Sequence, residues 1–144
     1  MQESDLGVFF EHQRDEQSNA MAAFPARARA AHLAHWTKVL ADETVIAKTT
    51  LFGGEVAGNV TSWRQDGMRL VGYWTGRQHW GKGIATEALG RFLEAVGRRP
   101  LHAYVAAHNL GSIRVLEKCG FSATGEPYES PRDGVVELLM ELKD

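Results

Sequence analysis

The stretch GRQHWGKG, residues 76–83, decides the fold, because it joins a β-like segment to a helix-like segment through closely spaced glycines. Gly76, Gly81 and Lys82 have the spacing of a P-loop, in which backbone amides and a lysine bind nucleotide phosphates. A P-loop continues with Ser or Thr, whose hydroxyl binds Mg²⁺, whereas this chain has Gly83. No apolar strand ending in Asp offers a second anchor for the metal. The stretch therefore argues against hydrolysis of ATP or GTP.

The same loop also departs from the dinucleotide-binding fingerprint. Gly81 and Gly83 are present, but Thr86 occupies the place of the third glycine. What remains is a loop that leads directly into a helix, where free backbone N–H groups and the helix dipole attract an anion. The stretch therefore suits a diphosphate held without a metal, such as the one in coenzyme A, or it is a tight turn and no more.

The residues ahead of the loop predict three antiparallel strands. Segments 44–52, 55–63 and 68–75 are rich in β-branched and aromatic residues, and the turn signals Gly53-Gly54 and QDG at 65–67 separate them. These segments are expected to form a meander.

The residues after the loop predict a crossover to a parallel strand. Apolar residues recur there at helical spacing until Pro100 ends the helix: Ile84, Ala85, Ala88, Leu89, Phe92, Leu93 and Val96. Segment 101–108 then alternates as a strand does. Because a helix separates it from 68–75, these two strands are expected to be parallel within a mostly antiparallel sheet.

The two ends of the chain complete a mixed α+β class. Ser4 or Asp5 is expected to begin a short helix, and residues 13–21 a polar connection. Pro25 is expected to start a second helix with the apolar stripe Ala28, Leu33, Trp36, Val39 and Leu40. Towards the C-terminus, 109–121 is expected to be a helix with Asn109 near its N-cap and Gly120 at its end, 125–134 a connection, and 134–142 a last strand.

The composition is that of an ordinary globular chain, with 144 residues, 44% apolar, 24% charged and a net charge of −2. It predicts one domain over residues 1–144 and no strong field that would attract nucleic acid or a membrane. The one cysteine, Cys119, allows no internal disulfide, and neither a signal peptide nor a membrane span is visible, so a cytoplasmic protein is expected. The histidines have no metal-ligand spacing, so no metal is expected.

Two blocks of the sequence resemble the GNAT N-acetyltransferases. VGYWTGRQHWGKGIATEAL, residues 71–89, resembles their acetyl-CoA-binding motif, with Gln78, Gly81 and Gly83 at its core positions. NLGSIRVLEKCGF, residues 109–121, resembles their second block, especially in the branch of ribosomal-protein N-terminal acetyltransferases. The order of the predicted elements agrees from about residue 4 to the end.

The resemblance implies how acetyl-CoA is bound. The cofactor would lie in a V-shaped opening between the strands at 68–75 and 101–108, with a backbone N–H near Trp74 and Thr75 polarising the thioester carbonyl. The amides of residues 80–85 would hold the pyrophosphate, and Asn109 the pantetheine. The implied cofactor-binding set is Trp74, Thr75, Gln78, Trp80, Gly81, Lys82, Gly83, Ile84, Ala85, Thr86 and Asn109.

The chain departs from the family pattern at its implied catalytic positions. Many relatives place a tyrosine acid on the last helix, where this chain has Leu116, and Ser112 is the expected substitute, as in the ribosomal-protein branch. His108 is a second candidate for proton transfer. Leu70 occupies a place where that branch often has Glu, a potential base. The first strand of the family is expected to be absent or truncated, since only residues 1–3 precede the first helix.

The resemblance implies an acetyl-CoA-dependent N-acetyltransferase, an acyltransferase that moves an acetyl group directly to a primary amine of a protein N-terminus or a small molecule. The acidic residues Glu11, Asp15 and Glu16 lie where the family places its acceptor, although a solvated loop explains them equally. A CoA-binding sensor without catalysis and a transferase using another acyl-CoA both stay open. The sequence names neither the acceptor nor the general base, and it fits a monomer or a homodimer.

Overall fold

The computed structural model describes residues 1–131 and 133–143, and three α-helices precede its first strand. These N-terminal elements are η1 (Glu3–Asp5), α1 (Leu6–Gln13), α2 (Glu16–Ala22) and α3 (Arg29–Ala41). The sheet and its crossovers follow as β1 (Ile46–Phe52), β2 (Glu55–Gln65), β3 (Met68–Thr75), η2 (Arg77–His79), α4 (Ile84–Val96), β4 (Leu101–Ala106), α5 (Leu110–Lys118), β5 (Ser122–Ala123), β6 (Tyr128–Glu129) and β7 (Val136–Leu142).

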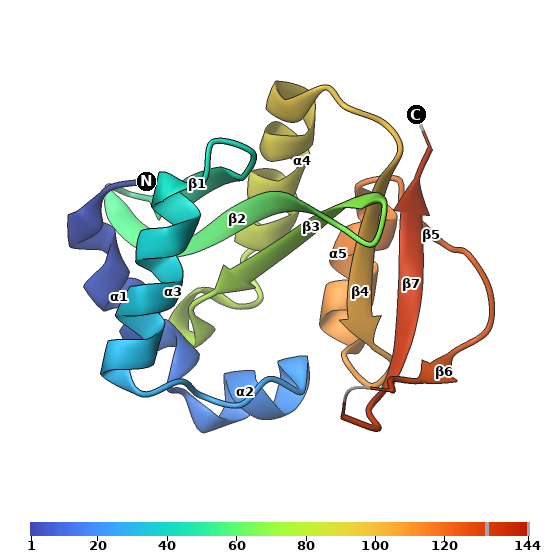
Figure 1. Ribbon diagram of the computed structural model, residues 1–144, viewed down its shortest axis with the longest axis horizontal. Helices are drawn as coiled ribbons and strands as arrows, with labels where there is room; N and C mark the ends of the chain where they lie inside the picture. Colours follow the sequence, from blue (N-terminus) through green and yellow to red (C-terminus); the bar gives the residue numbers. More distant parts are fainter. Residues whose placement is uncertain (132, 144) are drawn as a thin grey trace.

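The strands form a seven-stranded sheet in the order β1-β2-β3-β4-β7-β5, with β6 paired to β7 beside this path. Every pairing is antiparallel except that of β3 with β4, whose recorded register is the one pair Leu70 and His102. Beyond these residues the two strands diverge, as Figure 1 shows. The predicted mixed class, the meander and the V between parallel strands are therefore confirmed.

Helices cover both faces of this sheet. In Figure 1, α1 and α3 lie in front of β2 and β3, whereas α4 lies behind them, and α5 packs beside α4. The larger buried cluster lies under α4 and α5, and it contains Val60, Val71, Leu89, Phe92, Leu93, Leu101, Ala103, Val105, Leu116, Phe121, Met140 and Leu142. A smaller cluster of Leu6, Phe9 and Trp36 lies on the α1 and α3 side.

The two hairpins of the meander use turns that the sequence predicts. Gly53 and Gly54 have φ of 58° and 83°, and Asp66 and Gly67 have φ of 52° and 77°. Two successive left-handed residues match the twist of the flanking strands, and glycine or Asp adopts them at little steric cost.

The N-terminal third differs most from the expectations. Residues 13–21 hold most of α2 rather than a connection, because Asp15 caps this helix by accepting the backbone N–H of Ser18 at 2.9 Å. Helix α3 begins at Arg29 and not at Pro25. In agreement with the expectation for the first strand, no strand precedes α1 in the described residues, where residues 3–5 form a 3-10 helix.

The apolar stripe predicted for α3 is right for Trp36, which is buried, and for Val39, which packs against the Trp36 cluster, but it is wrong for its two leucines. Leu33 and Leu40 are 54% and 39% exposed, whereas His32 and Trp36 are buried. The Trp36 ring packs on Phe9 at 5.2 Å between centroids, and its Nε1 donates to His32 Nε2 at 3.1 Å. This hydrogen bond lets an imidazole occupy an apolar contact face.

Smaller differences concern element ends and connections. Helix α4 ends before Pro100 is reached, at Gly97, whose φ is 64° and whose N–H donates to Leu93 O. The strand expected over 101–108 ends at Ala106, and the connection at 125–134 contains β6. In the residues described, no helix is long and apolar enough to cross a lipid bilayer.

The buried His32 makes the stability of the fold depend on pH. Burial, reinforced by the positive charges of Arg27 and His35, lowers the pKa of His32 to about 4. In the unfolded chain this histidine titrates near its ordinary value of about 6.5. Between these values the unfolded chain binds a proton that the folded chain does not, so acidification favours unfolding.

We predict that the free energy of unfolding falls as the pH is lowered from 7 towards about 4, and that His32→Gln reduces this fall. The Gln side chain does not titrate, and its oxygen is able to accept from Trp36. Urea denaturation at several pH values measures the effect. Some dependence remains in the variant, because burial also lowers the pKa of His12 and of His35. Equal pH dependence in the two proteins would contradict the assignment.

Candidate functional site

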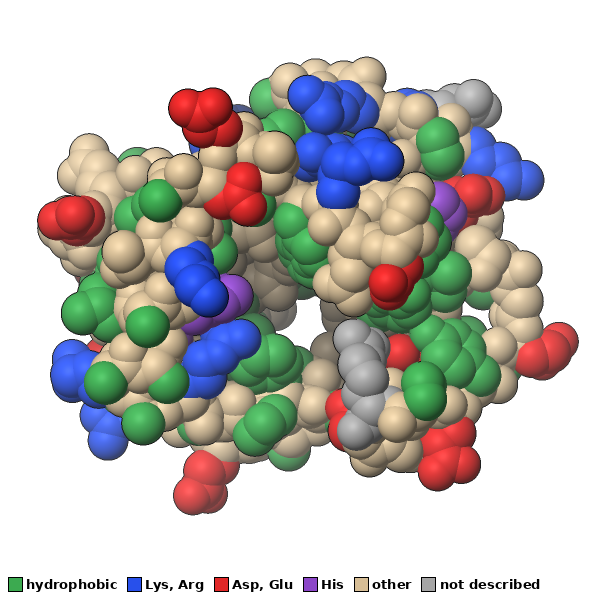
Figure 2. Space-filling model, viewed as in Figure 1, with side chains coloured by type: hydrophobic (Ala, Val, Ile, Leu, Met, Phe, Trp, Pro, Cys, Tyr) green, Lys and Arg blue, Asp and Glu red, His purple; other side chains and the backbone are tan. Residues whose placement is uncertain are grey.

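A cavity of about 440 Å³ opens where β3 and β4 diverge. Its walls come from the end of β3, the loop after β3, the first turn of α4, residues 109–118 at the start and along one side of α5, and the helix α2. Figure 2 shows the molecule hollowed in the same central region. Of the residues that the sequence selects, the cavity is lined by Trp74, Thr75, Trp80, Gly81, Gly83, Ile84, Ala85, Thr86, Asn109 and Ser112.

The glycine loop leaves the start of α4 open to the cavity. Gly81 and Gly83 have φ of 75° and 74°, a left-handed conformation that glycine adopts readily, and a Cβ on either would meet nothing within 4 Å. Gly83 is the N-cap of α4, and no side chain caps this helix. The first amides of α4 are thus available to an anion, and the helix dipole favours negative charge there.

Three residues selected from the sequence are not among those that line the cavity: Gln78, Lys82 and His108. The Lys82 ammonium lies 5.7 Å from the centre of the ring of Phe52, the last residue of β1. His108 Nε2 donates to Ala20 O at 2.8 Å and so joins the end of β4 to α2. This bond makes His108 a structural link, which argues against its expected place in proton transfer.

Two hydroxyl groups meet on the cavity wall between β3 and α5. Ser112 Oγ lies 2.5 Å from Tyr73 Oη, and both residues line the cavity. Asn109 Oδ1 caps α5 by accepting the Ser112 N–H at 3.2 Å, which fixes the serine in the first turn. Burial raises the pKa of Tyr73 to about 12, against the opposing hydrogen bond from Ser112, so the phenol keeps its proton near neutral pH.

Tyr73 is one of several lining residues that the sequence did not single out, with Met21, Arg114 and Lys118 among the others. Its signal is the alternation along β3, because Tyr73 follows Val71 on the face that the crossover helix covers. Leu116, at the position where many GNAT relatives carry tyrosine, is 2% exposed and belongs to the main core. The phenol at the start of α5 is therefore that of Tyr73, which belongs to β3, whereas position 116 of the helix itself carries a buried leucine.

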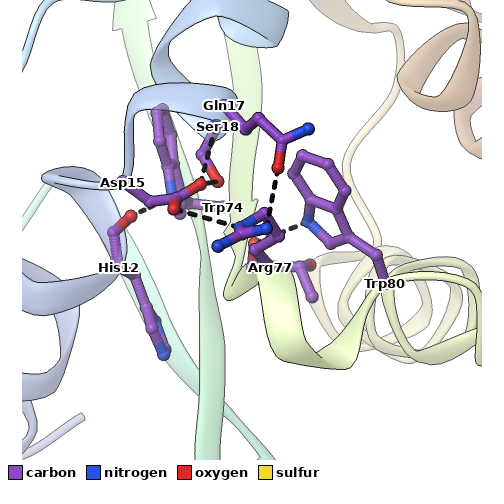
Figure 3. Close-up of polar contacts among 8 residues, drawn as sticks. His12, Asp15, Gln17, Ser18, Trp74, Arg77 and Trp80 are labelled. Carbon is purple, nitrogen blue, oxygen red and sulfur yellow. Dashed lines mark hydrogen bonds and ion pairs between the residues drawn. The ribbon is translucent and has the colours of Figure 1, made fainter.

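A network of polar contacts ties α2 to the loop after β3. Arg77 Nε donates to Asp15 Oδ1 at 3.0 Å, and Arg77 Nη1 donates to Gln17 Oε1 at 2.7 Å. Figure 3 shows Arg77 between these side chains, with the indole of Trp80 donating to the backbone beside it; that bond, to Thr75 O, is 3.0 Å long. Helix α2 and the glycine loop are therefore linked through one guanidinium group.

The acidic residues near α2 are neutralised by these contacts. The hydrogen bond from the Ser18 N–H, followed by the Arg77 charge, lowers the pKa of Asp15. Glu11 forms ion pairs with Arg14 at 3.3 Å and Arg29 at 3.9 Å. Neither of these carboxylates belongs to the cavity lining, and neither does Glu16.

A close backbone approach positions the end of β3. Gly58 lies opposite Thr75 in the β2–β3 register, and a Cβ on Gly58 would lie 2.1 Å from Trp74 O. The register of β1 with β2 shifts at this level, and Gly76 N donates to Ala57 O at 2.8 Å. The end of β3, which lines the cavity, therefore packs directly against Gly58. A larger residue at position 58 would require the backbone to move.

Across residues 1–131 and 133–143, no group of three or more His, Cys, Asp or Glu side chains is placed to hold a metal ion.

Comparison with known proteins places this architecture among acetyltransferases. A family model described as an acetyltransferase (GNAT) domain matches residues 1–122. The uncharacterized N-acetyltransferase p20 of Bacillus licheniformis is 29% identical over 83 residues, 54% of this chain and 47% of that protein. The probable N-acetyltransferase YjcK of Bacillus subtilis strain 168 is 46% identical over 60 residues, 39% of this chain and 33% of that protein. The chain spans half or less of the length of these curated relatives.

Solved structures share the fold at low sequence identity. The aminoglycoside acetyltransferase AAC(6')-Ib in complex with coenzyme A gives a TM-score of 0.81 at 21% identity, covering 99% of this chain and 91% of that one. The spermidine N-acetyltransferase from Vibrio cholerae, in complex with CoA and spermine, gives 0.83 at 15% identity, covering 99% and 92%. Both likenesses extend over nearly the whole length of this chain.

We predict opposite effects on stability for two glycine-to-alanine substitutions. Gly58→Ala should destabilise the protein by about 1–3 kcal/mol, because its methyl group collides with Trp74 O. Gly90→Ala, in the open interior of α4, should stabilise it by up to ~1 kcal/mol. Chemical denaturation measures both. A Gly58→Ala protein as stable as the unmodified chain would show that β2 and β3 are not tightly apposed here.

Proposed function

This chain belongs to the GNAT acetyltransferase family, and we propose that it transfers an acetyl group from acetyl-CoA to a primary amine. The observation that carries the proposal is the cavity itself. One wall offers the uncapped start of α4 behind two glycines, and another offers the hydroxyls of Tyr73 and Ser112. The start of α4 suits the diphosphate of acetyl-CoA. The hydroxyl pair suits its thioester, because a hydroxyl stabilises the sulfur as it leaves.

The residues present fit acetyl-CoA as the donor. The absence of side chains at Gly81 and Gly83 leaves space for close approach of the pyrophosphate to the amides of α4. Trp74 and Thr75 line the cavity, and we assign a backbone N–H of this stretch to the thioester carbonyl. Asn109 Oδ1 already caps α5, which leaves its amide NH₂ for the pantetheine.

In the proposed reaction the amine nitrogen attacks the acetyl carbon and the carbon–sulfur bond breaks. The sulfur leaves as a thiolate that accepts a hydrogen bond from Ser112 Oγ, while Tyr73 Oη donates to the serine oxygen. The amine must be neutral to attack. Its proton passes to water or to the imidazole of His79, because His79 lines the cavity and no carboxylate belongs to the described lining.

The hydroxyl pair distinguishes catalysis from simple CoA binding. Leu116 and Leu70 are buried and offer no proton-transfer group, which alone would suit a CoA sensor. The contact between Ser112 and Tyr73 restores a hydroxyl at the start of α5 and favours a transferase. Ser112 in this place also supports the branch of ribosomal-protein N-terminal acetyltransferases, in which the acceptor is a protein N-terminus. A small-molecule amine, as in the complexes with spermine or kanamycin, is the alternative acceptor.

We predict that Gly83→Glu weakens acetyl-CoA binding at least about tenfold, because the carboxylate obstructs and repels the pyrophosphate. Gly67→Glu is the matched control, since Gly67 has the similar φ of 77°, is equally open, and lies in the β2–β3 turn. It should bind acetyl-CoA as the unmodified chain does. Calorimetric titration with and without EDTA measures both. Unchanged affinity in a folded Gly83→Glu protein, or binding that EDTA abolishes, would place the pyrophosphate elsewhere.

We predict that Ser112→Ala lowers kcat by roughly 10- to 1000-fold with little change in acetyl-CoA affinity, because its hydrogen bond to sulfur strengthens as charge develops. Tyr73→Phe should also lower kcat, because it removes the hydrogen bond that Tyr73 donates to the Ser112 hydroxyl. The double variant should therefore be no slower than the slower single variant. Thiol release under saturating donor measures kcat. Multiplicative losses in the double variant would show that the two hydroxyls act separately.

A further inference from the structure

The cavity has two ends whose positions are fixed by contacts of α5 and of the turn before it. At the C-terminal end of this helix, Cys119 Sγ donates to Thr86 O in the first turn of α4, at 3.5 Å. Before the start of α5, in the turn that follows β4, His108 Nε2 donates to Ala20 O of α2, at 2.8 Å. The cavity therefore runs from the glycine loop at one end to α2 at the other, with Ser112 on the wall between them.

The charges of the lining are concentrated at the glycine-loop end. Arg114 and Lys118 lie one turn apart on α5, and both line the cavity. Neither forms an ion pair with a described residue, so both positive charges are available to phosphate groups. Together with the start of α4, they assign this end to the donor. The acceptor amine must then approach from the α2 end.

The α2 end is apolar. Met21 and Ala22 line the cavity there, and Met21 is 41% exposed. Phe24, 38% exposed, lies with its ring 6.0 Å from that of Trp74, another lining residue. The polar lining residue of α2 is Ser18, whose hydroxyl already donates to Asp15 Oδ2 at 2.9 Å. An acceptor entering here meets hydrocarbon and aromatic surface.

The charges closest to this apolar end are cationic or neutralised. No described lining residue carries a carboxylate. Asp15 is paired with Arg77, and the Arg27 guanidinium lies 4.9 Å from the centre of the Phe24 ring. On the neighbouring β6 and β7, Glu129 and Glu137 stand outside the lining, and Tyr128 donates to Glu137 at 3.0 Å. Nothing in this lining would offset the desolvation of a second ammonium group.

From this arrangement we infer that the acceptor is an amine flanked by uncharged, apolar surface, and that polycationic amines such as spermidine are disfavoured. The inference rests on the proposed function, because it takes the donor to occupy the glycine-loop end. A second positive charge would lie against Met21 and Trp74 and near Arg27, where it gains no ion pair. An apolar flank would instead bury hydrocarbon against the same residues.

The test compares two amines that differ by one charge. Hexylamine and 1,6-diaminohexane have the same chain length, and each is titrated into the protein saturated with CoA. Hexylamine should bind at least about tenfold more tightly. The same pair is then compared by thiol release with acetyl-CoA. Equal affinities, tighter binding of the diamine, or no measurable binding of hexylamine would each overturn the inference.

A variant at the cavity mouth gives the reciprocal result. Met21→Glu places a carboxylate at the apolar end and should shift the binding preference towards the diamine. Met21→Gln is polar but uncharged, and it should weaken the binding of hexylamine without strengthening that of the diamine. Equal effects of the two variants would contradict the inference. Selective binding of hexylamine without thiol release would leave the inference standing and would defeat the proposed transferase activity, so the two are separable.

Discussion

The structure depends on one limited contact, the parallel pairing of β3 with β4 at Leu70 and His102. Leu70 is 1% exposed, and His102 Nε2 is 3.0 Å from Glu141 Oε2 on β7, so both partners are held firmly in the sheet. Because the pairing stops there, backbone groups beyond it on the facing edges have no ladder partner. Such groups bind ligand or water instead. The opening is thus a consequence of sheet topology, and the glycine loop begins where β3 ends.

Elements from both sides of the opening hold it in shape. On one side, Gly58 keeps the end of β3 against β2, and Arg77 joins the loop after β3 to α2. On the other, His108 joins the end of β4 to the same helix. Helix α2 therefore bridges the two diverging strands (Figure 1). The Asp15 cap stabilises the first turn of this helix. A short helix held at both ends makes a defined wall for a substrate.

The two ends of the cavity have different electrostatic character. Free cations and open amides lie near the start of α4, whereas the cations around α2 are paired or stacked and its lining side chains are apolar. Between them, Tyr73 and Ser112 provide a hydroxyl pair whose phenol is kept protonated by burial. In the proposed acyl transfer from CoA to an amine, the open amides of α4 would bind the diphosphate, the hydroxyl pair would donate a hydrogen bond to the sulfur, and the apolar end would receive the amine.

The sequence by itself determined the features that depend on local conformation. Glycines predicted both hairpins and the loop before α4, and the structure gives glycines at these places a left-handed φ. The spacing of apolar residues predicted β3, α4 and β4. These signals were readable because each lies within a few neighbouring residues. The same local signals selected most of the lining residues between Trp74 and Thr86, although Gln78 and Lys82 in this stretch lie outside the lining. Tertiary structure alone decided which residues meet across the chain. It decided that Ser112 contacts Tyr73, that His108 binds α2, and that His32 is buried while Leu33 is exposed. The partners of these residues are far away in the sequence, so local patterns do not encode them.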